Sequence, residues 1–344
     1  MDEIFNQNLP YQPISKKDDS DGWVGSELFY AQQEAKNKLP SELINNWDDQ
    51  IAKWLDVKKD ELYNNFSAEQ IDAIGIAIYQ IKNNKAFILG DETGKGKGRI
   101  LAGITKWAIL NNLNVVFFTE KHALFTDFWR DLTFTENTDI NYKVLHPEAK
   151  IYSIDGEEIY KSSNKTVKQI LEEKEINKTL ILTTYSQVSN SQQKKRLGWF
   201  EEILGEGIII LDESHNASGE SNTNKFISKL LKKAKGVIFS SATFMKEENE
   251  INLYQKAYSL DKSEWMLLNN LLNNAPNGLR RFLTYDLTRN LSLWRREHEP
   301  PMHEWETIYS DIKNADIFSQ ILQELAKMHE EIMLKHQEQM GNIW

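Results

Sequence analysis

The chain has 344 residues, of which 40% are hydrophobic, 27% are charged and none is cysteine, and its formal net charge is −10. The hydrophobic share includes 10 Trp, 12 Tyr and 15 Phe, which is enough to bury a core and excludes wholesale disorder. The absence of cysteine excludes disulfides and thiolate metal sites. The acidic balance argues against a tight, autonomous DNA-binding domain, because such a domain shows a basic footprint. The N-terminus lacks the pattern of a signal peptide and no apolar stretch is long enough to span a membrane, so we expect a cytoplasmic protein.

The N-terminal part of the chain is polar and then helical in pattern. Residues 1–25 predict an extended arm without a core of its own, and residues 26–64 carry amphipathic helical patterns. A further helix is expected to begin after Ser67 and to run to about Ile81. Ser67 can cap this helix, and Gln70 stands at the third helical position, where it completes a capping box.

From residue 86 onwards, short apolar runs alternate with helical patterns. The apolar runs are continuous, as in strands that are buried on both faces, and they cover 86–89, 115–118, 180–183, 207–211 and 236–239. Helices are expected between them, so the sequence predicts an α/β fold with a mostly parallel central sheet flanked by helices. We expect a surface insertion over 155–178. After about residue 246 we expect no further strand, only helices over 250–275 and 314–340.

A glycine-rich segment, Gly90 to Arg99, lies between the first of these runs and the helix expected over 98–110. Glycines let backbone N–H groups curl round an anion, and the N-terminus of a helix adds a favourable dipole. The segment therefore predicts a phosphate-binding loop in which Lys97 reaches the β- and γ-phosphates of a nucleotide; the alternative is a tight glycine turn. The residues expected at the nucleotide are Thr93, Gly94, Lys95, Gly96, Lys97, Gly98 and Arg99.

This segment departs from the usual phosphate-loop pattern G-x-x-x-x-G-K-[ST] at two positions. Asp91 stands where the pattern has its first glycine, and Gly98 stands where it has a hydroxyl residue. A Ser or Thr at the second position would bind Mg²⁺ directly. Without it, the metal is left with more water or with a substitute ligand.

Two further strand ends carry polar side chains. Asp212 and Glu213 follow the run 207–211; Asp212 would hold Mg²⁺, through water, and Glu213 would position and deprotonate an attacking water. Ser240-Ser241-Ala242-Thr243 ends the next run, where hydroxyl groups can bond to the loop around His215. Because parallel strands end at one edge of a sheet, these groups should converge on the glycine-rich segment. Taken singly, each could also be an ordinary solvated strand end.

Together these segments resemble superfamily 2 helicases and translocases, and more closely the Strawberry notch-like group with its bacterial, plasmid and phage members. The resemblance covers roughly residues 8–260. The segments that carry it are 66–70, 90–99 with its Gly-Lys-Gly-Arg ending, 119–121, 185–187, 212–217 and 240–244. The Gly-Lys-Gly-Arg ending is typical of that group, which accounts for Gly98.

The resemblance implies ATP-driven movement on nucleic acid, double-stranded DNA in the first place, with ATP and Mg²⁺ as cofactors. Gln70 would read the adenine base, in addition to or instead of its capping role. His215, Ser241, Ala242 and Thr243 would couple nucleotide state to the nucleic-acid surface. The surface that tracks the phosphate backbone would carry Thr119, Lys121, Thr184 and Tyr185, although these could also be ordinary strand-end residues.

The same resemblance divides the chain into an arm with a helical extension (1–64), a first RecA-like ATPase domain (65–247) and a helical region (248–344). Superfamily 2 motors have a second RecA-like domain that supplies arginine fingers, so we expect one from a longer chain or a separate subunit. A cluster of arginines within this chain could substitute for these fingers, namely Arg280, Arg281, Arg289, Arg295 and Arg296. The alternative, which we prefer, is that the cluster is a solvated basic face or a nucleic-acid contact.

Three functional hypotheses follow from this sequence. The first is a nucleic-acid-dependent ATPase motor domain, favoured by Lys97, Asp212 and Glu213. The second is a regulatory or scaffold module that binds nucleotide with little hydrolysis, favoured by Gly98 and the acidic balance. The third is a small-molecule P-loop enzyme such as a kinase, against which the strand ends at 212–215 and 240–243 argue. The histidines at 122, 146, 298 and 303 have no metal-ligand spacing, and we assign them no role.

Overall fold

The computed structural model describes residues 8–135, 139–173, 176–188, 193–205, 207–219, 221–244, 248–258, 268 and 276–298. All of these fall within one compact unit, Met1–Glu299. Within the described residues, no helix is both long enough and apolar enough to cross a membrane. The helix predicted over 314–340, most of the one predicted over 250–275, and His303 lie outside the described residues.

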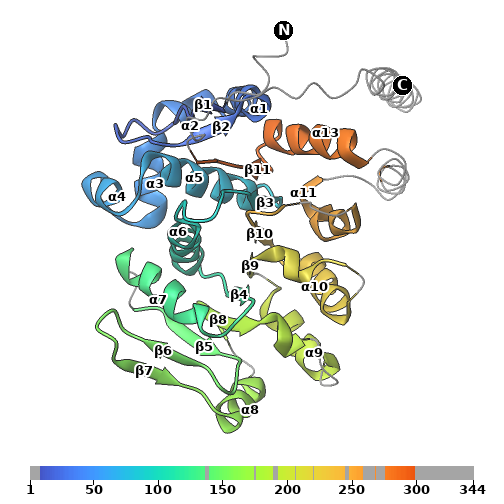
Figure 1. The fold of residues 1–344 in the computed structure, drawn as a ribbon. Coiled ribbons are helices and arrows are strands. Elements are labelled where there is room, and N and C mark those ends of the chain that lie inside the picture. The colour runs from blue at the N-terminus through green and yellow to red at the C-terminus, as the bar shows by residue number, and fades with distance from the viewer. Residues whose placement is uncertain are drawn as a thin grey trace, which may run out of the picture. The chain divides into compact units, whose positions relative to one another are not determined.

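A seven-stranded sheet forms the centre of the described part of the chain (Figure 1). In spatial order its strands are β11 (Leu293–Trp294), β3 (Ala86–Leu89), β10 (Gly236–Ser240), β9 (Ile208–Asp212), β4 (Val115–Thr119), β8 (Thr179–Thr184) and β5 (Asn141–Val144). Every neighbouring pair is parallel. The predicted α/β fold with a parallel central sheet, the RecA-like arrangement, is confirmed.

Helices cover both faces of this sheet. One face is covered by α5 (Ala68–Lys82), α6 (Lys97–Leu110) and α7 (Leu124–Phe134), and the other by α9 (Gln193–Ile203), α10 (Asn222–Lys233), α11 (Gln255–Tyr258) and α13 (Pro276–Arg289), as Figure 1 shows. The remaining α-helices are α1 (Ser26–Asn37), α2 (Ser41–Asn45), α3 (Trp47–Leu55), α4 (Lys59–Asn65) and α8 (Asn164–Glu172). Short 3₁₀ helices are η1 (Tyr185–Val188), η2 (Ser214–Ala217) and η3 (Glu248–Tyr254).

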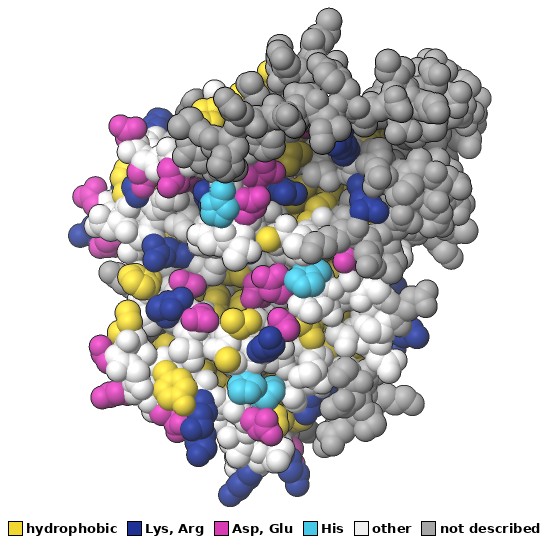
Figure 2. All heavy atoms as spheres, in the orientation of Figure 1, with side chains coloured by type: hydrophobic (Ala, Val, Ile, Leu, Met, Phe, Trp, Pro, Cys, Tyr) yellow, Lys and Arg dark blue, Asp and Glu magenta, His cyan; other side chains and the backbone are white. Residues whose placement is uncertain are grey.

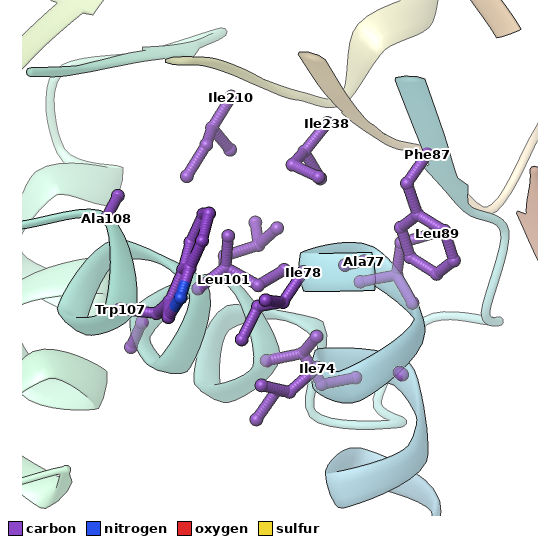
Figure 3. Close-up of a cluster of buried hydrophobic side chains, with 14 of the residues drawn as sticks. Ile74, Ala77, Ile78, Phe87, Leu89, Leu101, Trp107, Ala108, Ile210 and Ile238 are labelled. Carbon is purple, nitrogen blue, oxygen red and sulfur yellow. The ribbon is translucent and has the colours of Figure 1, made fainter. Parts of the chain in front are cut away.

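Side chains of the inner strands alternate between two hydrophobic cores, one on each face of the sheet. In β3, Phe87 and Leu89 join the core under α5 and α6, whereas Ala86 and Ile88 join the opposite core. Figure 3 shows the first core, where Trp107 of α6 lies among aliphatic side chains of α5 and the strands. Because both faces are buried, these strands need apolar residues at every position, which is why their sequence runs are continuous.

Two strands of the central sheet were not predicted from the sequence. β5 is an edge strand of sequence NYKV with only Val144 fully buried, so it lacks a continuous apolar run. β11 has two residues and lies beside β3, so the expectation that no strand follows residue 246 is wrong. The region predicted as a surface insertion, 155–178, contains β7 (Glu158–Lys161) and α8, and β7 pairs with β6 (Lys150–Tyr152), which precedes this region. The division at residues 64 and 247 remains a prediction.

A buried carboxylate of α5 binds the first part of the N-terminal arm. β1 (Asn8–Pro10) pairs with β2 (Trp23–Gly25), and the chain between them reaches Asp72 of α5, whose side chain has no exposed surface. Asp72 accepts hydrogen bonds from Tyr11 Oη (2.7 Å), the backbone N–H groups of Ile14 (2.7 Å) and Ser15 (2.9 Å), and Trp47 Nε1 (2.9 Å). Burial raises the pKa of Asp72 to about 6.

We expect Asp72→Ala to lower the free energy of unfolding by about 3 kcal/mol or more, because a hydrogen bond left unmade in the interior costs roughly 1–3 kcal/mol. The four donors that now share Asp72 would lose their acceptor. Chemical denaturation followed by tryptophan fluorescence measures this change. The exposed Asp18 is the control, since Asp18→Ala should leave the midpoint unchanged. Equal stability of the Asp72 variant and the wild type would show that the arm is not anchored there.

Candidate active site

The segment between β3 and α6 forms an open loop at the carboxyl end of the sheet. Gly94 and Gly96 have φ angles of +86° and +73°, a left-handed conformation that glycine adopts without strain. α6 begins at Lys97 with no side-chain cap and no acidic residue in its first turn. The uncapped N-terminus of this helix, with its positive dipole end, therefore remains available to an anion. Thr93, Gly94 and Gly96 are exposed, so the loop is accessible to a ligand.

Lys97 closes this loop on itself. Its Nζ donates hydrogen bonds to the backbone carbonyls of Asp91 (2.9 Å) and Glu92 (3.2 Å). The ammonium group thus lies within the loop, where a phosphate oxygen could replace either carbonyl as its acceptor. Arg99 behaves differently, because its guanidinium lies over the ring of Phe134, 4.8 Å from the centroid.

The neighbouring helix α7 limits the space for a side chain at position 98. A Cβ atom added to Gly98 would lie 2.1 Å from Oδ2 of Asp131. The carboxylate of Asp131 thus occupies the space that the side chain of a Ser or Thr would take. A Ser or Thr at this position would require the Asp131 side chain to move.

Gln70 has two partners in this structure. Ser67 N–H donates to Gln70 Oε1 (3.0 Å) and Gln70 N–H to Ser67 Oγ (3.4 Å), so the predicted capping box is confirmed. Its Nε2 also donates to the carbonyl of Gly96 (3.4 Å), which ties the start of α5 to the glycine loop. Reading of an adenine base by this side chain stays a prediction.

Asp212 ends β9 between two other strands that supply its hydrogen bonds. Thr119 Oγ1 donates to Oδ2 (3.1 Å) from β4, and Ser240 Oγ donates to Oδ1 (3.2 Å) from β10. Burial, together with the neighbouring negative charge of Glu213, raises the pKa of Asp212 to about 6, while Lys97 acts in the opposite direction. A cation at this position would favour the ionised carboxylate.

Glu213 and His215 continue the site along the next turn. Glu213 has a φ angle of +48°, a left-handed conformation that costs free energy for a residue with a side chain. His215 Nδ1 lies 3.4 Å from Glu213 Oε2, 3.1 Å from Ser241 Oγ and 3.4 Å from Thr243 Oγ1. The residues predicted to couple nucleotide state are thus brought together, with Ala242 between the two hydroxyl residues.

The four residues predicted on the nucleic-acid surface are not placed alike. Thr119, Thr184 and Tyr185 are buried, at 0%, 1% and 6% exposure. Thr119 bonds to the Asp212 carboxylate, and Tyr185 Oη donates to the Asp212 carbonyl (2.8 Å). The side chains of Thr119 and Tyr185 are therefore internal supports of Asp212, whereas the hydroxyl of Thr184 bonds to Ser186 Oγ (2.9 Å). The exposed side chain is that of Lys121, which lies 3.3 Å from Glu120.

The arginine cluster predicted near residue 290 is not a single basic face. Arg281 is exposed and Arg289 is paired with Asp286 (2.8 Å), whereas Arg296 is 3% exposed and is bound to Asp91. Arg296 is therefore neither an arginine finger supplied by this chain nor part of a solvated basic face. His298, to which no role was assigned, lies at the loop, with Nε2 2.8 Å from the carbonyl of Thr93.

The site suits Mg²⁺ bound together with a nucleotide better than a protein-only metal site. Among the described residues, no group of three or more acidic or histidine side chains could hold a metal ion. Mg²⁺ is commonly held by one or two carboxylates, phosphate oxygens and water. Asp212 is the carboxylate that this arrangement would use. On the face that Figure 2 presents, the acidic, basic and histidine side chains of the described residues are interspersed, and the basic ones do not form a stripe.

The parallel sheet carries a glycine loop after β3, with a lysine inside the loop, and a carboxylate pair at the end of β9, two strands away from β3 in the sheet. This combination defines a nucleotide-binding P-loop protein. The chain belongs to the P-loop containing NTP hydrolase pore-1 family, whose profile matches residues 5–258. It is therefore a member of a family of nucleoside-triphosphate hydrolases. No curated protein matches the chain.

Solved structures of low sequence identity share parts of the fold. The Sulfolobus solfataricus SWI2/SNF2 ATPase core domain is 16% identical with a TM-score of 0.46, over 68% of this chain and 44% of that one. A nuclease-deletion mutant of the Type ISP restriction-modification enzyme LlaGI, in complex with a DNA substrate mimic, is 17% identical with a TM-score of 0.40, over 64% and 24%. The ATP-dependent Type ISP restriction-modification enzyme LlaBIII bound to DNA is 15% identical with a TM-score of 0.37, over 51% and 12%. In each case the match spans less than half of the other chain.

Proposed function

We propose that this chain is the ATP-binding motor domain of a nucleic-acid-dependent ATPase of helicase superfamily 2, of the Strawberry notch-like type found in bacteria, plasmids and phages. It would hydrolyse ATP to move on or remodel double-stranded DNA when a second RecA-like domain completes it. The proposal assigns ATP and Mg²⁺ to the loop 93–99 and to Asp212.

One observation carries this proposal, namely the chain of contacts that leads from the Asp212–Glu213 pair to the end of β10. His215 lies within 3.4 Å of Glu213, Ser241 and Thr243. A change at Glu213 on hydrolysis would therefore reach the strand end beside it. A small-molecule kinase has no use for such a relay, so the motor hypothesis is favoured over the kinase hypothesis.

The chemistry follows from the positions of three side chains. Lys97 would transfer its hydrogen bonds from the loop carbonyls to the β- and γ-phosphates and offset their charge. Glu213 would accept a proton from the attacking water, with His215 holding its carboxylate in place. Mg²⁺, held by Asp212, would supply further charge neutralisation on the phosphates.

A second domain is part of the proposal because the arginine at the loop is already engaged. Arg296 is bound to Asp91 and to the carbonyl of Lys95, so it cannot reach a γ-phosphate without breaking a buried ion pair. Arginine fingers contribute about 10³–10⁵ in rate in related chemistry. A chain without one would bind nucleotide and hydrolyse it slowly, which is the behaviour of the regulatory module that we keep as the second candidate.

The test is ATP turnover of the complete protein, measured with no nucleic acid, with double-stranded DNA, with single-stranded DNA and with RNA. We expect double-stranded DNA to stimulate turnover most strongly. Turnover that is the same in all four conditions would overturn the motor proposal. Nucleotide binding without any turnover would favour the regulatory module.

A further inference from the structure

Behind the phosphate loop lies a buried cluster of three charged side chains. Arg296, which follows β11, is 3% exposed, and its partners Asp91 and Glu69 are 0% and 1% exposed. Arg296 and Asp91 are 205 positions apart in the sequence. Burying three charged groups is unfavourable unless they are well paired, so their arrangement needs an explanation.

Asp91 takes the position at which the usual phosphate loop has glycine, and its carboxylate accepts three hydrogen bonds from Arg296. The backbone N–H of Arg296 donates to Oδ1 (2.8 Å), Nε donates to Oδ2 (3.0 Å), and Nη2 also donates to Oδ2. The same Nη2 donates to the carbonyl of Lys95 (3.2 Å). Arg296 thus holds both the beginning of the loop and the residue two positions before Lys97.

The backbone on each side of Arg296 follows the loop as well. Gly90 N–H donates to the Trp294 carbonyl (2.8 Å), and Glu92 N–H donates to the Arg296 carbonyl (3.1 Å). His298 N–H then donates to Glu92 Oε2 (2.7 Å). The pairing of β11 with β3, visible in Figure 1, therefore extends into the loop.

Glu69 links this cluster to the N-terminal arm. Its Oε1 accepts hydrogen bonds from Ser20 Oγ (2.8 Å) and from the backbone N–H groups of Asp21 (2.9 Å) and Gly22 (3.0 Å). Its buried Oε2 has no hydrogen-bond partner and lies 4.0 Å from Arg296 Nη1. The guanidinium therefore lies between two carboxylates, of which only Asp91 is bound directly.

We propose that Arg296 is a positioning residue for the phosphate loop. Through Asp91 and the Lys95 carbonyl it keeps the loop in the shape that accepts a nucleoside triphosphate. The usual phosphate loop has a glycine at its first position, whereas here Asp91 stands at that position and is bound by an arginine from a distant segment. This inference rests on the proposed nucleotide binding at the loop. It goes further by making nucleotide affinity depend on the segment that follows β11.

The test is the dissociation constant for Mg²⁺-ATP of Arg296→Met, measured on protein whose fold is verified by circular dichroism. We expect the constant to rise by about tenfold or more, because a loop that is competent one tenth of the time binds tenfold more weakly. The matched control is Arg295→Met, since the Arg295 side chain is 29% exposed and lies 3.3 Å from Glu297. It should bind within twofold of wild type.

Rescue distinguishes positioning from a general loss of stability. Asp91→Gly added to Arg296→Met removes the unpaired carboxylate and restores the usual glycine, so affinity should return to within about threefold of wild type. Should Arg296→Met not fold, Arg296→Lys retains the charge but lacks the planar fork, and we expect it to bind ATP about fivefold more weakly.

Wild-type affinity in folded Arg296→Met or Arg296→Lys would overturn this proposal, as would a double variant without recovery. These results differ from a failure of the proposed function. If the wild-type chain itself bound no ATP, the nucleotide site would be wrong before any variant was compared.

Discussion

Lys97→Ala should weaken ATP binding by about a hundredfold or more. Its ammonium group lies within the loop on the carbonyls of Asp91 and Glu92, and it is the cation that the loop would present to the phosphates. A charge-assisted hydrogen bond contributes roughly 1.5–3 kcal/mol, and the loss of two such bonds corresponds to two or more factors of ten in affinity. Titration calorimetry or a fluorescent ATP analogue measures the effect.

The control for this experiment is Lys106→Ala on the same helix. Lys106 Nζ donates to the carbonyl of Thr135, at the end of α7. We expect its ATP affinity to equal that of wild type. Undiminished affinity in Lys97→Ala would show that the segment 90–99 is a glycine turn and not a phosphate-binding loop.

Glu213→Gln should retain ATP binding but lower turnover of the complete protein by about 10²–10⁴-fold, the usual contribution of a general base. The amide keeps the size of the side chain and removes its ability to accept a proton. Glu213 is also held in a left-handed conformation beside His215, as expected for a side chain with a fixed task. Steady-state turnover and a parallel binding titration separate the two effects.

Glu202→Gln, an exposed position on α9, tests whether loss of any acidic side chain has the same effect. Its turnover should match that of wild type. If Glu213→Gln turned over ATP at the wild-type rate, the attacking water would have to be activated by another group, and the assignment of Glu213 would be wrong.

The parts of the fold that were predictable are those with strong local patterns. The strands at 86–89 and 236–239 and the capped helix from Ala68 were expected from continuous apolar runs and from the Ser67–Gln70 pair, and β10 extends one residue further, to Ser240. β11 could not be predicted, because two residues carry no periodicity. It forms because Trp294 is fully buried and its Nε1 donates to Tyr11 Oη (3.1 Å), a contact between residues far apart in the sequence.

The candidate site shows the same limit. Residue types and strand ends predict roles for Lys97, Asp212 and Glu213, but could not show which way the neighbouring side chains point. Thr119 turns inward because the buried Asp212 needs hydrogen-bond donors. Arg296 was expected only as a member of an arginine cluster, and its pairing with Asp91 was missed because the two residues are distant in sequence. The signal that pointed to it is the acidic residue in place of a loop glycine, because a buried carboxylate needs a cation.

The most direct test of the nucleotide site is a crystal structure of the chain with Mg²⁺ and a non-hydrolysable ATP analogue. We predict that the β- and γ-phosphates lie inside the loop between Glu92 and Lys97, that Lys97 Nζ has left the carbonyls of Asp91 and Glu92 for phosphate oxygens, and that Mg²⁺ is held on the side of Asp212. A nucleotide bound elsewhere, with Lys97 still on those two carbonyls, would contradict the account.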